Sequence, residues 1–223
     1  MDQYSNKIKY KHIIFDFDGT LADSFYLARE YFDMAARDSG VSGLTKEQIE
    51  KIREKRLTFK NVWNFIKDKD IALINYPRLF KNLLEELLFN KDRLRLFKEV
   101  PQLLTELKEQ GAKLYIVTYN QQNIVENTLK KYGCYEYFKA INAMELFKNK
   151  AEILLELFKR FSLEKKEVIY IGDEIKDIET AHEIGIKAIA VEWGFNTPRV
   201  LAKKEPEYQV KNFKQLKECL IPA

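Results

Sequence analysis

Apolar and polar residues alternate along this chain with two different periods. Near-continuous apolar runs of four to seven residues end in a glycine or a polar residue, and amphipathic stretches with a helical spacing separate most of them. Ile153, Leu154 and Leu157 are typical of that spacing. Buried strands that alternate with single helices indicate a parallel sheet covered on both faces, so the pattern predicts an α/β, doubly wound fold. The predicted strands are 12–16, 113–118, 138–142, 167–173 and 187–191.

The segment between the first two predicted strands has a different pattern. It contains four helical stretches and no strand, and the second stretch begins with a Thr-x-x-Gln capping box at Thr45 and Gln48. Phe59, Trp63 and Ile66 form an apolar stripe that we expect in the core of a helical bundle. The expected helices are 24–40, 45–52, 58–66 and 77–89. The sequence therefore predicts a core domain made of residues 1–22 and 98–223, with an inserted helical domain at 23–97.

Composition narrows the class of protein. The 223 residues carry a net charge of +4 and show no dense basic cluster, which is compatible with an anionic small molecule and does not favour nucleic acid. The polar N-terminus and the absence of a run of about 18 apolar residues predict a soluble, cytoplasmic protein with no membrane partner. The sequence does not distinguish a monomer from a homodimer. Cys134 and Cys219 have no metal-type spacing and are expected to act as small apolar side chains.

Polar side chains gather where the predicted strands end. In an open parallel sheet the carboxyl ends of the strands form one ligand-binding edge, so residues that follow different strands meet there. Lys150, at the start of a predicted helix, is expected at the same edge. The residues concerned are Asp16, Asp18, Thr118, Lys150, Asp173 and Asp177.

These residue types suit phosphoryl transfer. Asp16 and Asp173 are hard oxygen ligands of the kind that Mg²⁺ prefers, and a carboxylate can also be a nucleophile. Thr118 and Lys150 can donate to phosphoryl oxygens and offset the charge of the transition state. Asp18 lies two residues after Asp16, close enough to protonate a leaving alkoxide and then to deprotonate water.

These motifs resemble those of the haloacid dehalogenase superfamily of phosphatases and phosphotransferases. The resemblance is carried by Asp-Phe-Asp-Gly-Thr-Leu at 16–21, Thr118, Lys150 and Gly-Asp-Glu-Ile-Lys-Asp at 172–177, which occur in the family's order. The insert is similar to the family's type-one helical cap, as in phosphoglycolate phosphatase-like members. The resemblance implies a Rossmann-like core and a Mg²⁺-dependent phosphatase that hydrolyses a small phosphorylated metabolite through an aspartyl phosphate.

The resemblance also implies a role for each residue of the motifs. Asp16 would be the nucleophile and a Mg²⁺ ligand, and Asp18 the general acid and base whose backbone carbonyl also binds Mg²⁺. Asp173 would be the second acidic ligand, and Asp177 would act in the metal site through water or by orienting Lys150. Lys150 and Thr118 would hold the phosphoryl group. The further expected phosphate or substrate contacts are Gly19, Thr20, Tyr119, Asn120 and Arg53.

Some positions depart from the family's pattern. Glu174 stands where Ser or Thr is frequent, and Tyr119 stands where Asn is frequent, so Asn120 is expected to take over that phosphate contact. Lys148 competes with Lys150, which is preferred because it directly precedes an apolar helix. The segment 193–196 either lines the site or forms a structural turn. In the insert, Arg53, Arg56 and Lys60 could recognise a charged leaving group.

Two other functions stay open at this point. A phosphomutase or phosphotransferase of the same superfamily would need a cap that protects the phosphoenzyme from water. A non-catalytic binding protein on this fold would be expected to lack Asp16 or Lys150, and both are present. A dehalogenase is disfavoured, since displacing halide needs no acid in the position of Asp18.

Overall fold

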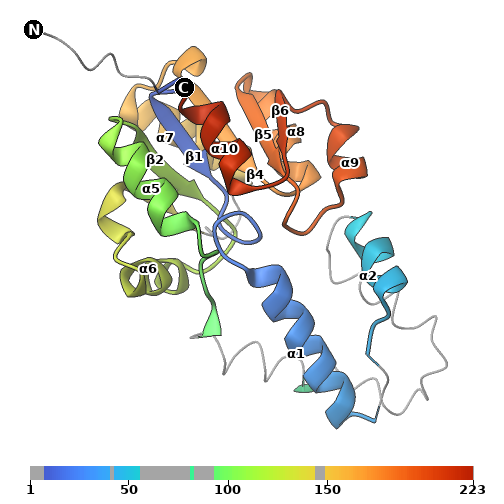
Figure 1. The fold of residues 1–223 in the computed structure, drawn as a ribbon. Helices are drawn as coiled ribbons and strands as arrows, with labels where there is room; N and C mark the ends of the chain where they lie inside the picture. The colour runs from blue at the N-terminus through green and yellow to red at the C-terminus, as the bar shows by residue number, and fades with distance from the viewer. Residues whose placement is uncertain (1–7, 41–42, 56–80, 83–92, 144–148, 223) are drawn as a thin grey trace, which may run out of the picture.

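The computed structural model describes residues 8–40, 43–55, 81–82, 93–143 and 149–222 (Figure 1). A single sheet of six parallel strands runs through this part of the chain in the order β3-β2-β1-β4-β5-β6. The strands are β1 His12–Phe15, β2 Lys113–Val117, β3 Phe138–Asn142, β4 Val168–Gly172, β5 Lys187–Val191 and β6 Tyr208–Val210. All five predicted strands are confirmed. Strand β6 was not predicted, since three residues are too few to show a period.

Helices cover both faces of this sheet, as the pattern predicted. The helices of the core are α5 Val100–Glu109, α6 Gln122–Lys131, α7 Lys150–Phe161, α8 Ile175–Ile184, α9 Pro198–Ala202 and α10 Phe213–Leu220. Two short 3₁₀ turns, η3 Tyr135–Tyr137 and η4 Lys165–Glu167, precede β3 and β4. Both α9 and α10 follow β5, beyond the last predicted strand.

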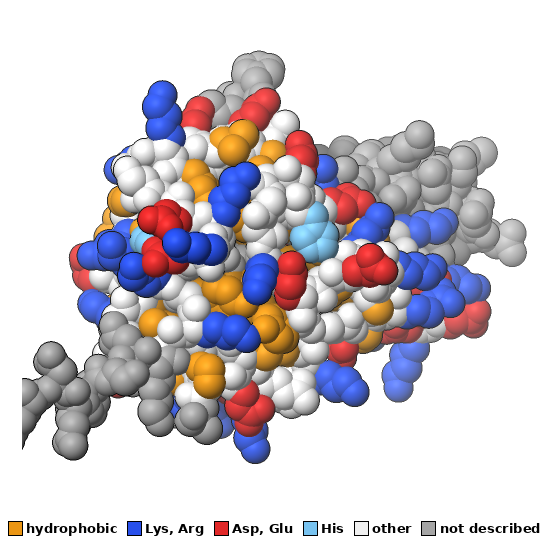
Figure 2. Space-filling model, turned by 90° about the horizontal axis from the view of Figure 1, so that it is seen from above, with side chains coloured by type: hydrophobic (Ala, Val, Ile, Leu, Met, Phe, Trp, Pro, Cys, Tyr) orange, Lys and Arg blue, Asp and Glu red, His pale blue; other side chains and the backbone are white. Residues whose placement is uncertain are grey.

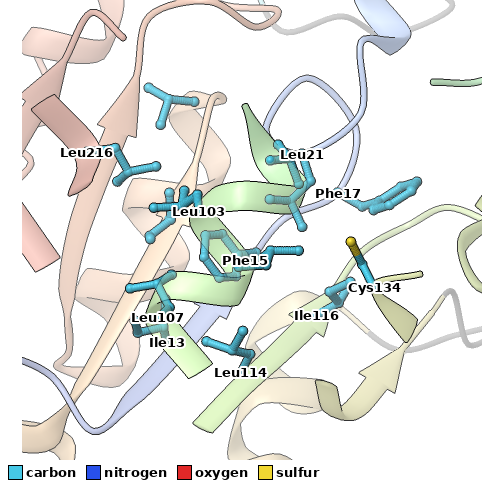
Figure 3. Close-up of a cluster of buried hydrophobic side chains, with 14 of the residues drawn as sticks. Ile13, Phe15, Phe17, Leu21, Leu103, Leu107, Leu114, Ile116, Cys134 and Leu216 are labelled. Carbon is cyan, nitrogen blue, oxygen red and sulfur yellow. The ribbon is translucent and has the colours of Figure 1, made fainter. Parts of the chain in front are cut away.

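Alternation along the strands divides the core into two clusters of buried side chains. Ile13 and Phe15 point to the face covered by α5, α6 and α10, where Cys134 is also buried (Figure 3). Ile14, between them, points to the opposite face and packs against α7 and α8. Phe17 continues the first series beyond the end of β1. This parity places the side chain of Asp16 on the α7 side of the sheet.

The order of the strands creates a crevice at the carboxyl edge of the sheet. After β1 the chain builds β2 and β3 on one side and then crosses to build β4, β5 and β6 on the other side. The point at which the chain switches from one side of the sheet to the other lies between β1 and β4. These strands are paired, with Phe15 opposite Ile171. Ligands bind at such switch points in open α/β sheets, so the residues that follow β1 and β4 are placed for chemistry.

The described part of the insert is helical. It contains α1 Ser24–Asp38 and α2 Lys46–Arg53, which lie beyond the carboxyl edge of the sheet in Figure 1. The predicted capping box is present, because Gln48 N–H donates to Thr45 Oγ1 at 3.3 Å and Thr45 N–H to Gln48 Oε1 at 2.8 Å. The stretch 58–66, with its apolar stripe, and most of 77–89 lie outside the described residues. The division into two domains stays a prediction.

The opposite edge of the sheet, where the strands begin, has a mixed surface. Figure 2 shows Lys and Arg side chains interspersed with Asp and Glu, and hydrophobic side chains between them. No basic stripe of the kind that follows a nucleic-acid backbone is visible on this face. In the part of the chain that the structure describes, no helix combines the length and apolar character needed to cross a bilayer.

Candidate active site

The loop after β1 turns tightly at Gly19. Asp16 N–H donates to the Ile171 carbonyl at 2.8 Å and so extends the strand ladder to the first carboxylate. Gly19 has a φ of +74°, and a Cβ built there would lie 2.3 Å from Asp173 Oδ2. Only glycine combines this backbone conformation with such a close approach. The turn therefore needs its glycine, and it brings the loop after β1 against the acid that follows β4.

Lys150 joins two of the predicted acids. Its Nζ lies 2.6 Å from Asp16 Oδ1 and 2.7 Å from Asp177 Oδ1, and all three side chains are buried. Lys150 is the first residue of α7, whose N-cap Asn149 forms a capping box with Glu152. The cap fixes where the helix begins and so directs the lysine into the crevice. The competing Lys148 lies outside the described residues.

Burial and charge oppose each other in this group. Burial raises the pKa of Asp16 well above its usual range, and the Lys150 ammonium opposes that rise. Burial lowers the pKa of Lys150, but the Asp16 and Asp177 carboxylates reverse this and raise it well above its usual value. A lysine so placed stays an ammonium, which is the form that donates to anionic oxygens.

Three carboxylates could share one metal ion. Oxygen atoms of Asp16, Asp173 and Asp177 all lie within 4.8 Å of one another. Asp173 accepts from Thr20 Oγ1 at 2.9 Å and from Phe195 N–H at 2.6 Å, and its burial raises the pKa of its carboxyl well above the usual range. A cation at this point would favour the ionised carboxylates, and an all-oxygen acidic donor set suits Mg²⁺.

Both carboxylate oxygens of Asp177 accept hydrogen bonds from groups of the protein. Its Oδ1 accepts from Lys150, and its Oδ2 accepts from Glu174 N–H at 3.1 Å. Tyr170, which the sequence analysis did not single out, adds its hydroxyl 3.4 Å from the same Oδ1. Of the two roles considered for Asp177, these contacts favour the orientation of Lys150.

Asn120 makes a different contact from the one expected. Its Nδ2 donates to Asp18 Oδ1 and Oδ2 at 3.1 and 3.0 Å, so the amide holds the Asp18 carboxyl rather than being directed at a phosphate. Burial raises the pKa of Asp18. The Thr118 hydroxyl accepts from Asn120 N–H at 3.1 Å, and the Tyr119 hydroxyl accepts from Lys150 N–H at 3.2 Å. Thr118, Tyr119 and Asn120 thus meet Asp18 and Lys150 at one edge.

Arg53, a predicted substrate contact, binds the segment after β5 and makes no hydrogen bond to the acid cluster itself among the described residues. Its side chain is only 16% exposed, and its guanidinium donates to Glu50 and to the backbone carbonyls of Phe195, Gly194 and neighbouring residues. These contacts engage the guanidinium with protein acceptors, and direct contact of Arg53 with a substrate stays a prediction. Arg56 and Lys60 lie outside the described residues.

The segment after β5 proves to line the site. Phe195 N–H binds Asp173, Asn196 Oδ1 accepts from Ile175 N–H at 2.9 Å, and Trp193 Nε1 donates to the Thr20 carbonyl at 3.2 Å. The only signal in the sequence was that Trp-Gly-Phe-Asn follows a strand that ends at the same edge. Between the two interpretations of 193–196, the contacts favour the one that places it in the site.

Comparisons with known proteins agree with this fold and site. The family model described as haloacid dehalogenase-like hydrolase matches residues 13–191. A phosphoglycolate phosphatase of Synechococcus elongatus is 28% identical over 199 residues, which cover 88% of this chain and 90% of that protein. A putative pyrophosphatase of Caldanaerobacter subterraneus is 24% identical and covers 94% of each chain. The crystal structure of a putative phosphatase from Clostridium difficile aligns with a TM-score of 0.75 at 23% identity, over 95% of this chain and 99% of that one.

A parallel sheet with an acid cluster and a buried lysine at its switch point defines a Rossmann-like fold with a site suited to phosphoryl transfer. The chain belongs to the haloacid dehalogenase-like hydrolase family. Together with the phosphatase relatives, this membership identifies the protein as a phosphatase of that family, as the sequence motifs predicted.

Proposed function

We propose that this phosphatase hydrolyses a small phosphate monoester in a Mg²⁺-dependent reaction, with Asp16 as the nucleophile. One observation carries the proposal. The Asp16 carboxylate is buried at the switch point of the sheet, 2.6 Å from the Lys150 ammonium and next to Asp173. A carboxylate that only capped a turn would not need a buried lysine and two further acids around it.

The carboxylates of Asp16 and Asp173 and the backbone carbonyl of Asp18 would hold the Mg²⁺ ion. Bound there, the ion would neutralise negative charge on the phosphoryl oxygens and so ease attack by a second anion. Lys150 and the Thr118 hydroxyl would donate hydrogen bonds to the phosphoryl oxygens. Asp177 and Tyr170 keep the Lys150 ammonium in place.

The side chains divide the reaction into two displacements. A carboxylate oxygen of Asp16 attacks phosphorus and the bond to the leaving oxygen breaks, while the Asp18 carboxyl gives that oxygen its proton. Asp18 then accepts a proton from water as the water oxygen attacks phosphorus, and the bond to Asp16 breaks to release phosphate. The raised pKa of Asp18 favours the protonated form that the first step needs.

The substrate is proposed only as a class. Relatives that cover most of the chain are named for phosphoglycolate and for pyrophosphate, both small anions. Phosphoglycolate-like monoesters are therefore the first compounds to test. A cytoplasmic location and a monomeric or dimeric state remain expectations from the sequence.

The test is release of inorganic phosphate from a panel of phosphorylated metabolites, with Mg²⁺ and with a chelator. Wild type is compared with Asp16→Asn and with the control Asp38→Asn, which changes an exposed acid at the end of α1. We expect selective turnover that needs Mg²⁺, survives in the control and is lost in Asp16→Asn. Equal background in all three proteins across the panel, or full activity of Asp16→Asn, would contradict the proposal.

A further inference from the structure

The segment between β5 and α9, residues 192–197, contacts the insert on one side and the acid cluster on the other. We call it the β5 loop. It belongs to the core, and the residues of the insert that touch it are 139 or more positions away in sequence. Sequence spacing gives no hint of this connection, because only the packing of α2 against the carboxyl edge brings the two segments together.

On the insert side, Arg53 at the end of α2 holds the backbone of this loop. Its Nε donates to the Phe195 carbonyl at 3.3 Å, and its Nη2 lies 3.1 to 3.4 Å from the carbonyls of Gly194, Glu192 and Asn196. A planar guanidinium can serve several carbonyls at once, whereas an ammonium is a single point charge. The Arg53 guanidinium therefore contacts the backbone carbonyls of four residues of the β5 loop.

The β5 loop also donates hydrogen bonds to the backbone of the insert. Asn196 Nδ2 donates to the carbonyls of Arg53 and Lys55 at 2.8 and 3.2 Å, and Thr197 N–H donates to the Arg53 carbonyl at 3.2 Å. Phe25 of α1 packs its ring 5.3 Å from the Arg53 guanidinium and 5.4 Å from the Phe195 ring. Because both helices of the described insert meet the loop, a movement of the insert would move the loop as well.

On the acid side, the loop fixes Asp173. Phe195 N–H donates to Asp173 Oδ2 at 2.6 Å. Trp193 Nε1 donates to the carbonyl of Thr20, whose hydroxyl donates to Asp173 Oδ1 at 2.9 Å. A Cβ built on Gly194 would lie 2.1 Å from Asp173 Oδ2, so the loop backbone is in close contact with the carboxylate. Any shift of the loop therefore disturbs both oxygens of Asp173.

We propose that Arg53 is a positioning residue, which ties the insert to the β5 loop and thereby holds the Asp173 carboxylate in the geometry that binds Mg²⁺. The inference rests on the proposed function, because it needs Asp173 as a metal ligand. The same contacts would then determine both the placement of the insert and the affinity of the site for Mg²⁺. Residues that orient a metal ligand alter metal affinity about 10- to 100-fold when changed.

The experiment compares Arg53→Met and Arg53→Lys with Arg199→Met. The control, Arg199→Met, removes an exposed ion pair between Arg199 and Glu54, whose N and O atoms lie 2.5 Å apart. This ion pair also joins the core to the insert, but it does not involve the carbonyls of the β5 loop. All proteins carry Trp63→Phe, which leaves Trp193 of the loop as the single tryptophan. Mg²⁺ binding without substrate is followed by Trp193 fluorescence and by calorimetry. KM and kcat are measured at saturating Mg²⁺, and Tm shows that each variant is folded.

We expect Arg53→Met to raise the Kd for Mg²⁺ about 10-fold and Arg53→Lys about 3-fold, with KM within about 2-fold of wild type at saturating Mg²⁺. Arg199→Met should keep both constants within about 2-fold. A large rise in KM with an unchanged Kd for Mg²⁺ would make Arg53 a substrate-binding residue and overturn the inference. Folded Arg53 variants with wild-type values of both would overturn it too. If wild type itself binds no Mg²⁺, the proposed function fails along with it.

Discussion

Lys150 offers the sharpest test of the electrostatics of the site. We predict that Lys150→Met, which keeps most of the length of the side chain and removes its charge, destabilises the protein and abolishes most of its activity. The ammonium has two carboxylate partners at 2.6 and 2.7 Å in a buried site. At an effective dielectric constant of about 20, each contact is worth roughly 6 kcal/mol before the cost of burying the ammonium.

The net effect is smaller than that sum. Removing one partner of a buried ion pair costs about 3–5 kcal/mol, because the remaining charge keeps its burial and loses its compensation. For a chain of this length that corresponds to a fall in Tm of about 6–20 °C. Loss of a charged donor to the phosphoryl group should lower kcat by about 10²- to 10³-fold.

The sign of the pH dependence follows from the same contacts. Without the lysine, the pKa of Asp16 rises further above its unfolded value, since burial already raises it and Lys150 opposes that rise. A carboxyl with a raised folded-state pKa costs stability where the unfolded chain is ionised, and the cost disappears below the unfolded pKa. The Tm deficit of Lys150→Met should therefore be largest at neutral pH and shrink as the pH falls toward about 4.

Thermal unfolding between pH 4 and pH 8 and steady-state phosphate release measure both effects. Lys159→Met is the matched control, since it lies on the exposed side of the same helix and should change stability by no more than about 0.5 kcal/mol. Activity within 3-fold of wild type and an unchanged Tm for Lys150→Met would refute the reasoning. Loss of activity in Lys148→Met alone would transfer the role to that residue.

Three further predictions test other parts of the molecule. Gly19→Ala should lower Mg²⁺-dependent kcat more than 10-fold. Gly40 has a similar φ of +70° but no atom within 4 Å of an added Cβ, so Gly40→Ala should lose about 1–2 kcal/mol of stability and keep its activity. Asp18→Asn should release about one equivalent of 4-nitrophenol from 4-nitrophenyl phosphate and then stall, because that leaving group needs no acid but the attacking water needs a base; steady turnover without a burst would argue against this role. Burial lowers the pKa of His12 below its usual 6.5, so its contribution to stability is complete above that pH and is lost as the pH falls through the lower folded-state pKa. Urea unfolding at pH 5 and pH 8 should show a smaller difference for His12→Gln than for wild type, and an equal difference would contradict the assignment.

The sheet, its two covered faces and the edge where the chemistry lies could all be predicted from the amino-acid pattern. Hydrophobic period fixes which residues of a strand point to one face, and the ends of parallel strands must share an edge. Asp16 and Asp173 could therefore be placed together without coordinates, although 157 positions separate them along the chain.

The hydrogen-bond partner of each polar side chain, in contrast, is visible only in the packed fold. The amide of Asn120 could have faced a phosphate and instead holds Asp18. The guanidinium of Arg53, an expected substrate contact, holds the β5 loop. A long polar side chain has several partners within reach, and the choice depends on through-space distances and burial that no local pattern encodes. Burial of apolar residues follows a period along the chain and can be predicted from it, whereas hydrogen-bond pairing at the site appears only when the segments are packed.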